Sequence, residues 1–133
     1  MDKETLSLIR AYLEKAKGKL KTASDLVADG AFDDAVSRAY YAAFHAASAV
    51  LLTEGLTADS HRGLLNSFGL HFVKTGKIGK KYARYLSNLK DDRESGDYEV
   101  FSTVDETIAK KALTEAFEFV KAIEKYLNGI IKP

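Results

Sequence analysis

The feature that most constrains the fold is an alanine-rich run over residues 37–47, Ser-Arg-Ala-Tyr-Tyr-Ala-Ala-Phe-His-Ala-Ala. Alanine has the highest helix propensity, and its small side chain lets neighbouring helices approach closely. The segment that contains this run, residues 32–54, is apolar on almost every side of a helix. Such a helix is normally buried, so the sequence predicts a central helix surrounded by others.

Two more segments in the first half of the chain have apolar side chains at helical spacing. The first covers residues 3–28, and Gly30 follows it as the expected stop. The next covers residues 60–74 and begins with Ser60, a residue type that caps helix N-termini. The short link at Gly30 predicts that the first two helices form an antiparallel pair.

The second half contains two further predicted helices. One covers residues 80–92, and the other runs to residue 128 from a capping box formed by Thr103 and Glu106. The only proline is residue 133, and no segment alternates polar and apolar residues as a strand does. We therefore expect an all-α fold, an antiparallel up-and-down bundle of about five helices, with residues 1–133 as a single domain.

The composition excludes several kinds of site. No apolar run approaches the roughly 20 residues that a membrane span needs, so we expect no membrane association. The chain has no cysteine, which excludes disulfides and thiolate metal ligands and favours a cytoplasmic location. Its three histidines lack the spacing of metal ligands. We expect neither a metal ion nor a cofactor.

Charge is unevenly distributed along the chain. Residues 60–90 carry seven basic side chains and no acidic one, whereas residues 91–118 carry nine acidic side chains. Clustered basic residues bind phosphates, and a helix N-terminus favours anions. The candidate nucleotide- or RNA-binding residues are His61, Arg62, Lys80, Lys81 and Arg84. The alternative is a solvated basic face that packs beside an acidic neighbour.

Two further groups of residues could form a site. On the alanine-rich helix, Arg38, Tyr41 and His45 share one stripe, while Tyr40 is expected to face the core. They either support a site or are polar groups satisfied within the packing.

The second group lies at the end of the predicted helix over residues 80–92. We expect Gly96 to end that helix, with Arg93 in its last turn and Asp97 and Tyr98 on the following loop. An arginine there can clamp a phosphate with two hydrogen bonds. It can equally pair with a neighbouring carboxylate, the candidates being Asp91, Asp92 and Asp97.

Three stretches together resemble the HEPN domain, a helical domain named for higher eukaryotes and prokaryotes and first thought to bind nucleotides. They are residues 37–47, the Ser-His-Arg-Gly turn at 60–63, and the segment from Arg93 to Tyr98. The resemblance covers residues 12–127 and is greatest to small archaeal and bacterial HEPN proteins encoded beside a minimal nucleotidyltransferase. It implies a helical bundle that forms a homodimer around the arginine-bearing loops.

The resemblance also implies an activity. Many HEPN proteins are metal-independent ribonucleases that act as toxins, with the nucleotidyltransferase as antitoxin. In their motif an arginine that holds the scissile phosphate is followed, after a gap of roughly four to six residues, by a histidine that helps to move the 2′-hydroxyl proton. Arg93 matches the arginine, but Tyr98 stands where histidine is expected. Tyrosine hydroxyls and carboxylates, such as that of Asp97, are both weak bases at neutral pH.

The resemblance therefore marks Arg93, Asp97 and Tyr98 as the candidate catalytic residues of a metal-independent endoribonuclease. Related nucleotidyltransferases transfer AMP to a tyrosine near this motif, and Tyr98 is the candidate for that role. The supporting residues would be Arg38, Tyr40, Tyr41 and His45. We expect a homodimer that binds or cleaves RNA and pairs with a minimal nucleotidyltransferase encoded nearby. The alternatives are a non-catalytic adaptor that binds nucleotide or another protein, and a structural bundle without a ligand.

Overall fold

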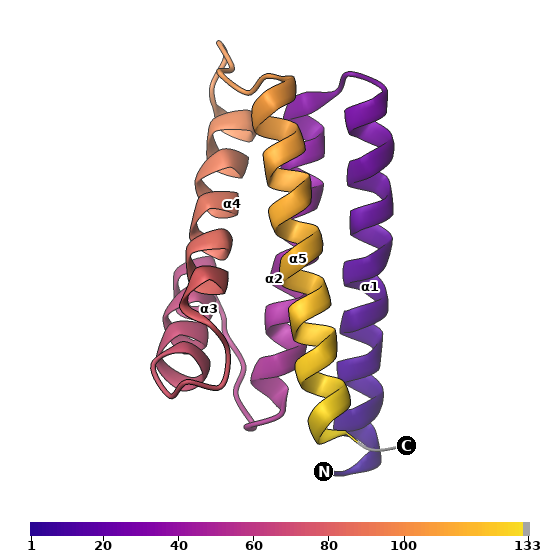
Figure 1. The fold of residues 1–133 in the computed structure, drawn as a ribbon, viewed down its shortest axis with the longest axis vertical. Helices are drawn as coiled ribbons and strands as arrows, with labels where there is room; N and C mark the ends of the chain where they lie inside the picture. Colours follow the sequence, from indigo (N-terminus) through magenta and orange to yellow (C-terminus); the bar gives the residue numbers. More distant parts are fainter. Residues whose placement is uncertain (132–133) are drawn as a thin grey trace.

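The computed structural model describes residues 1–131, which form helices and no strand. Four long helices run along the molecule in alternating directions (Figure 1). They are α1 (Lys3–Ala28), α2 (Phe32–Leu52), α4 (Lys80–Tyr98) and α5 (Glu106–Ile130). Between α2 and α4 the chain forms the short α3 (His61–Phe68), which continues directly into a π-helical turn, Gly69–Val73. The predicted all-α antiparallel bundle is confirmed.

Helix α2 lies at the centre, as predicted. It packs against α1, α4 and α5, and all seven of its alanines are at most 1% exposed. Their small side chains let three helices approach one backbone closely. The aromatic side chains Phe68, Phe72 and Phe119 fill the space between α3, the π-helical turn and α5. Among residues 1–131, no helix is both long enough and apolar enough to cross a membrane.

Several predicted helix ends are confirmed. Helix α1 has the predicted bounds, and Gly30 follows it with a φ of 77°, a conformation that favours glycine. Ser60 caps α3, its side chain accepting a hydrogen bond from the Gly63 backbone N–H at 2.9 Å.

Two other predicted helix ends are wrong by two residues. The cap of α5 is Asp105 rather than Thr103, and its side chain accepts the hydrogen bond from the Ile108 N–H. Helix α2 ends at Leu52, two residues before the predicted end.

The largest error concerns Gly96, which was expected to end α4. The helix instead continues through Gly96 to Tyr98. At position 96 a Cβ atom would lie 3.1 Å from Val36 Cγ2 and 3.3 Å from the backbone oxygen of Asp33. At Gly96, therefore, α4 packs closely against the start of α2. Packing between the helices outweighs glycine's low helix propensity, which costs about 1 kcal/mol.

This contact predicts opposite effects for two glycine-to-alanine substitutions. Gly96→Ala should destabilise the protein by about 1–2 kcal/mol, because forcing a methyl group into a packed contact costs more than the gain in helix propensity. Gly18→Ala, in α1 with no atom within 4 Å of its Cβ position, should stabilise it by up to about 1 kcal/mol. Urea unfolding of both variants measures the two effects. Changes in the free energy of unfolding that are equal and of the same sign in the two variants would contradict the close approach at Gly96.

Candidate functional site

Arg93 is held in place by the last turn of α4. Its Nε donates a hydrogen bond to Asp97 Oδ2 at 2.9 Å, and its Nη2 donates to the Tyr98 hydroxyl at 3.1 Å. The Arg93 side chain is only 13% exposed. These contacts form because α4 continues past Gly96, which places Asp97 one helical turn beyond Arg93. The expectation that Asp97 and Tyr98 lie on a loop is wrong, and the predicted pairing with a carboxylate is made by Asp97.

Two tyrosines of α2 support the same guanidinium group. The Cζ atom of Arg93 lies 5.8 Å from the ring centre of Tyr40 and 5.3 Å from that of Tyr41. The ring of Tyr98 is a third aromatic neighbour, at 5.3 Å. Cations are attracted to aromatic faces at such distances. The sequence named Tyr40 and Tyr41 as candidate supporting residues, and the structure places both rings beside Arg93.

His61, the first residue of α3, reaches the same pair of tyrosines. Its Nδ1 lies 2.6 Å from the Tyr40 hydroxyl, and its ring centre is 6.0 Å from that of Tyr41. Burial lowers the pKa of His61, and the positive charges of Arg93 and Lys90 lower it further. His61 is therefore an electrostatic neighbour of Arg93, although the two lie on different helices. Sequence reasoning identified His61 as a phosphate-binding candidate but did not place it beside Arg93.

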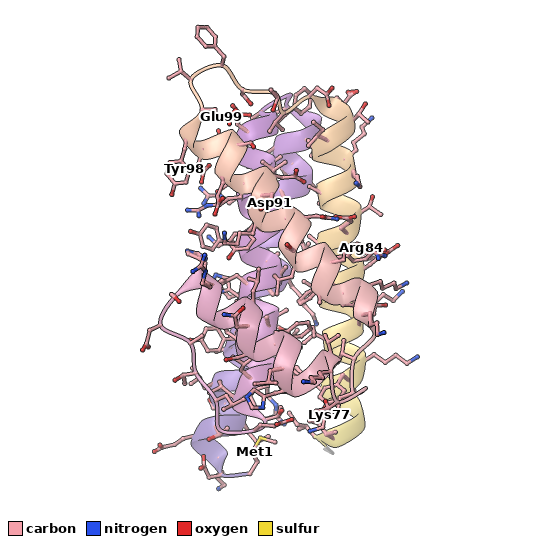
Figure 2. The ribbon with its side chains drawn as sticks, turned by 90° about the vertical axis from the view of Figure 1, so that its left-hand side faces the viewer. Met1, Lys77, Arg84, Asp91, Tyr98 and Glu99 are labelled. Carbon is pink, nitrogen blue, oxygen red and sulfur yellow. The ribbon has the colours of Figure 1, made fainter. Side chains whose placement is uncertain are left out.

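An open groove of about 700 Å³ is lined by three of these residues, His61, Arg93 and Tyr98. It lies between His61 of α3 and the last turns of α4, which contribute Arg93, Glu94 and Tyr98. In Figure 2, Asp91 and Tyr98 lie on the upper part of α4 and Glu99 directly follows that helix; all three line this groove. A larger hollow of about 970 Å³ between α1 and α5 contains none of the predicted site residues. We call the groove of about 700 Å³ the Arg93 groove.

Other predicted site residues lie outside this groove. Lys80, Lys81 and Arg84 belong to the first turns of α4, at the end opposite Tyr98 (Figure 2). Arg62 follows His61 but does not line the groove. Arg38 is exposed and forms no ion pair among residues 1–131. Within the described part of the chain, no group of three or more His, Asp or Glu side chains is arranged to hold a metal ion.

His45, the last of the predicted supporting residues, packs against α1 instead. Its ring stacks on Tyr12 at 6.2 Å, and its buried Nδ1 has no hydrogen-bond partner within residues 1–131. Burial, followed by the positive charges of Lys15 and Lys19, lowers the pKa of His45 to about 4. His45 is therefore neutral at physiological pH and belongs to the interface between α1 and α2.

The lowered pKa of His45 predicts a loss of stability in acid. The unfolded chain binds a proton near pH 6.5, while the folded chain resists it down to about pH 4. The contribution of neutral His45 to the stability of the fold is therefore fully present above pH 6.5, and it is lost as the pH drops towards 4. His45→Phe keeps the ring and removes the titration, so its urea midpoint should fall less between pH 7 and 4.5.

Wild type and His45→Phe must be compared directly, because the titration of Asp92 changes stability with pH in the opposite direction. Burial raises the pKa of the Asp92 carboxyl, so the contribution of that group to stability falls as the pH rises. Identical pH dependence of wild type and His45→Phe would show that His45 does not contribute.

Comparison with known proteins identifies the family. The model of the HEPN domain matches residues 9–126. "Putative toxin MJ0605" of Methanocaldococcus jannaschii is 37% identical over 131 residues, which is 98% of this chain and 97% of the relative. A "UPF0332 protein" of Thermotoga maritima is 33% identical over 127 residues, covering 96% of both chains. The crystal structure of TT1696 from Thermus thermophilus has the same fold, with a TM-score of 0.75, 19% identity, and coverage of 90% of this chain and 98% of that one. The alanine-rich central helix, the helical bundle and these matches together establish that the chain belongs to the HEPN domain family.

Proposed function

We propose that this protein is the toxin-like member of a toxin–antitoxin pair and that its Arg93 groove binds the phosphates of RNA. A minimal nucleotidyltransferase would be its partner, and the pair would act in the cytoplasm. The observation that carries the proposal is the constrained arginine at an open groove. Two N–H groups of Arg93 are used by Asp97 and Tyr98. A guanidinium has five donors, so within residues 1–131 three have no hydrogen-bond partner and are available to a phosphate.

The fixed position of Arg93 favours binding. Three aromatic rings hold the guanidinium before any ligand arrives. Less side-chain entropy is then lost when a phosphate binds. The name of the Methanocaldococcus jannaschii relative supports the toxin role. A non-catalytic adaptor that binds nucleotide or another protein is the alternative.

Metal-independent RNA cleavage is a second candidate function, favoured by the imidazole of His61 beside Arg93. Arg93 and His61 would stabilise charge that develops on the phosphate. Asp97 would accept the 2′-hydroxyl proton as the 2′-oxygen bonds to phosphorus, because its contact with Arg93 places it near a phosphate held there. The Tyr98 hydroxyl, which stands where the resemblance expects histidine, would give its proton to the departing 5′-oxygen as the bond between that oxygen and phosphorus breaks.

The experiment uses purified protein and a fluorescein-labelled single-stranded RNA in the presence of EDTA. Fluorescence anisotropy reports binding, and a denaturing gel reports cleavage. Binding with cleavage supports both functions, whereas binding alone supports a non-catalytic RNA-binding protein. Failure to bind RNA at low salt would reject the proposed function. Incubation with a minimal nucleotidyltransferase and ATP tests the role of Tyr98 as AMP acceptor, with Tyr98→Phe as the control for the mass increase.

We also propose that two copies pair at this end of the bundle. Next to Arg93, the loop between α4 and α5 exposes Val100 by 92% and Phe101 by 90%, and the preceding Tyr98 is 69% exposed. Exposed apolar side chains that lie together mark interaction surfaces. A second copy would cover them and bring two Arg93 grooves near each other.

This arrangement predicts that Phe101→Asp converts a dimer into a monomer, because a charge would be buried in an apolar contact. Sedimentation velocity measures the change. Leu70→Asp is the matched control, since Leu70 is also exposed but lies in the π-helical turn. A wild-type monomer, or a dimer that survives Phe101→Asp, would contradict the proposed interface.

A further inference from the structure

The contact between Tyr40 and His61 determines where the histidine carries its proton. Tyr40 is 0% exposed, and its hydroxyl lies 2.6 Å from His61 Nδ1. Burial raises the pKa of Tyr40 well above its ordinary value, so the hydroxyl keeps its proton at neutral pH. Within residues 1–131, Nδ1 is the partner of this hydroxyl. A buried hydroxyl proton needs an acceptor, which makes Tyr40 the donor and Nδ1 the acceptor.

The other ring nitrogen of His61 must then carry the proton of the neutral imidazole. A neutral imidazole has one N–H group and one acceptor nitrogen. Burial and the nearby positive charges of Arg93 and Lys90 lower the pKa of His61 and so favour its neutral form. With Nδ1 accepting from Tyr40, the proton is on Nε2.

We propose that Tyr40 holds His61 as the Nε2–H tautomer, so that the Arg93 groove offers a phosphate two kinds of donor, the Arg93 guanidinium and the His61 Nε2–H. The assignment to phosphate rests on the proposed function, whereas the tautomer does not. The two donors come from different helices, α3 and α4, and contact the same two tyrosines of α2. Tyr40 is a positioning residue, since it acts through His61.

The tautomer also limits what His61 can do in cleavage. Its acceptor nitrogen is occupied by the buried Tyr40 hydroxyl and cannot take a proton directly from a bound RNA. His61 therefore serves as a hydrogen-bond donor to phosphate rather than as the base of the histidine in the family motif. This assigns to Tyr40 a role beyond packing, although it is fully buried.

The tautomer is tested by NMR without any RNA. Long-range ¹H–¹⁵N correlation spectra of ¹⁵N-histidine-labelled protein distinguish the two neutral tautomers, and His61→Gln identifies the His61 signals among three histidines. We expect the Nε2–H pattern in wild type at neutral pH. Tyr40→Phe should lose it in favour of a mixture or the Nδ1–H form. An Nδ1–H pattern in wild type overturns the inference, as does a pattern unchanged by Tyr40→Phe.

A second readout concerns the phosphate. Single-stranded RNA should shift the His61 Nε2 signal, and Tyr40→Phe should weaken RNA binding about 3- to 10-fold, the effect of a misplaced hydrogen bond. Tyr12→Phe, which removes a tyrosine hydroxyl at the interface between α1 and α2 and outside the Arg93 groove, is the matched control and should leave affinity within about twofold. Should wild type have the Nε2–H tautomer but bind no RNA, the proposed function fails while the tautomer stands. RNA binding that leaves the Nε2 signal unmoved would overturn the two-donor arrangement. Circular dichroism confirms folding, and the wild-type spectrum decides the tautomer even if a variant does not fold.

Discussion

Arg93→Ala is expected to lower the affinity for single-stranded RNA by about 10- to 100-fold. Hydrogen bonds to a charged group contribute about 1.5–3 kcal/mol, and each 1.4 kcal/mol is a factor of ten. Arg93→Lys should recover little of this loss, because a lysine cannot present the flat set of donors that the tyrosine rings orient. Anisotropy titrations of all three proteins at one low salt concentration measure the effect.

The matched control is Arg10→Ala, which removes one exposed arginine from α1 and leaves the groove intact. It should change RNA affinity by less than about twofold. Because Arg93→Ala leaves Asp97 without its cation, its unfolding midpoint must be measured alongside. If Arg93→Ala remains folded and binds RNA as Arg10→Ala does, then Arg93 is not the phosphate ligand.

Asp97→Asn is expected to raise the affinity for RNA and to lower the rate of any RNA cleavage. Asp97 competes with a phosphate for the Arg93 guanidinium, to which it is paired at 2.9 Å. Its loss should raise RNA affinity about twofold to fivefold, the range for a partly exposed ion pair. Any metal-independent cleavage should fall by about 100-fold, because an amide cannot accept the 2′-hydroxyl proton and a positioned base contributes about 10²–10⁴-fold.

The control for this variant is Asp91→Asn. Asp91 lines the Arg93 groove and carries the same charge as Asp97, but no ion pair joins it to Arg93 within residues 1–131. A gain in affinity that is equal in the two variants would reflect net charge alone and would remove Asp97 as a competitor for Arg93. Cleavage that persists in Asp97→Asn would remove Asp97 as the base.

The sequence predicted the bundle well because its signals are local. Ser60 and Gly30 mark helix ends by their own chemistry, and the alanine run identifies a buried helix without knowledge of its neighbours. Gly96 misled the prediction because its role depends on Val36, which lies on another helix far earlier in the chain. A tight contact between two helices cannot be recognised from the spacing of either.

The candidate site shows the same division. Arg93, Asp97 and Tyr98 are close in sequence; the arginine indicated a phosphate site, and the family resemblance named the other two. Helical periodicity placed Tyr40 and Tyr41 on α2 but could not say what they contact. His61 and Arg93 both contact Tyr40 because of how α3 and α4 pack against α2, and that packing is a tertiary property. Neither the short loop before α3 nor the cap at Ser60 predicts the orientation of the His61 ring.

The central claim is that Arg93 contacts a phosphate of RNA, and the salt dependence of binding tests it most directly. The logarithm of the binding constant for a single strand falls with the logarithm of salt concentration by about 0.7 for each phosphate neutralised. The slope for Arg93→Ala should therefore be about 0.7 shallower than for wild type, while the slope for His61→Gln should remain unchanged because neutral His61 adds no charge. A slope for Arg93→Ala equal to that of wild type would contradict the account.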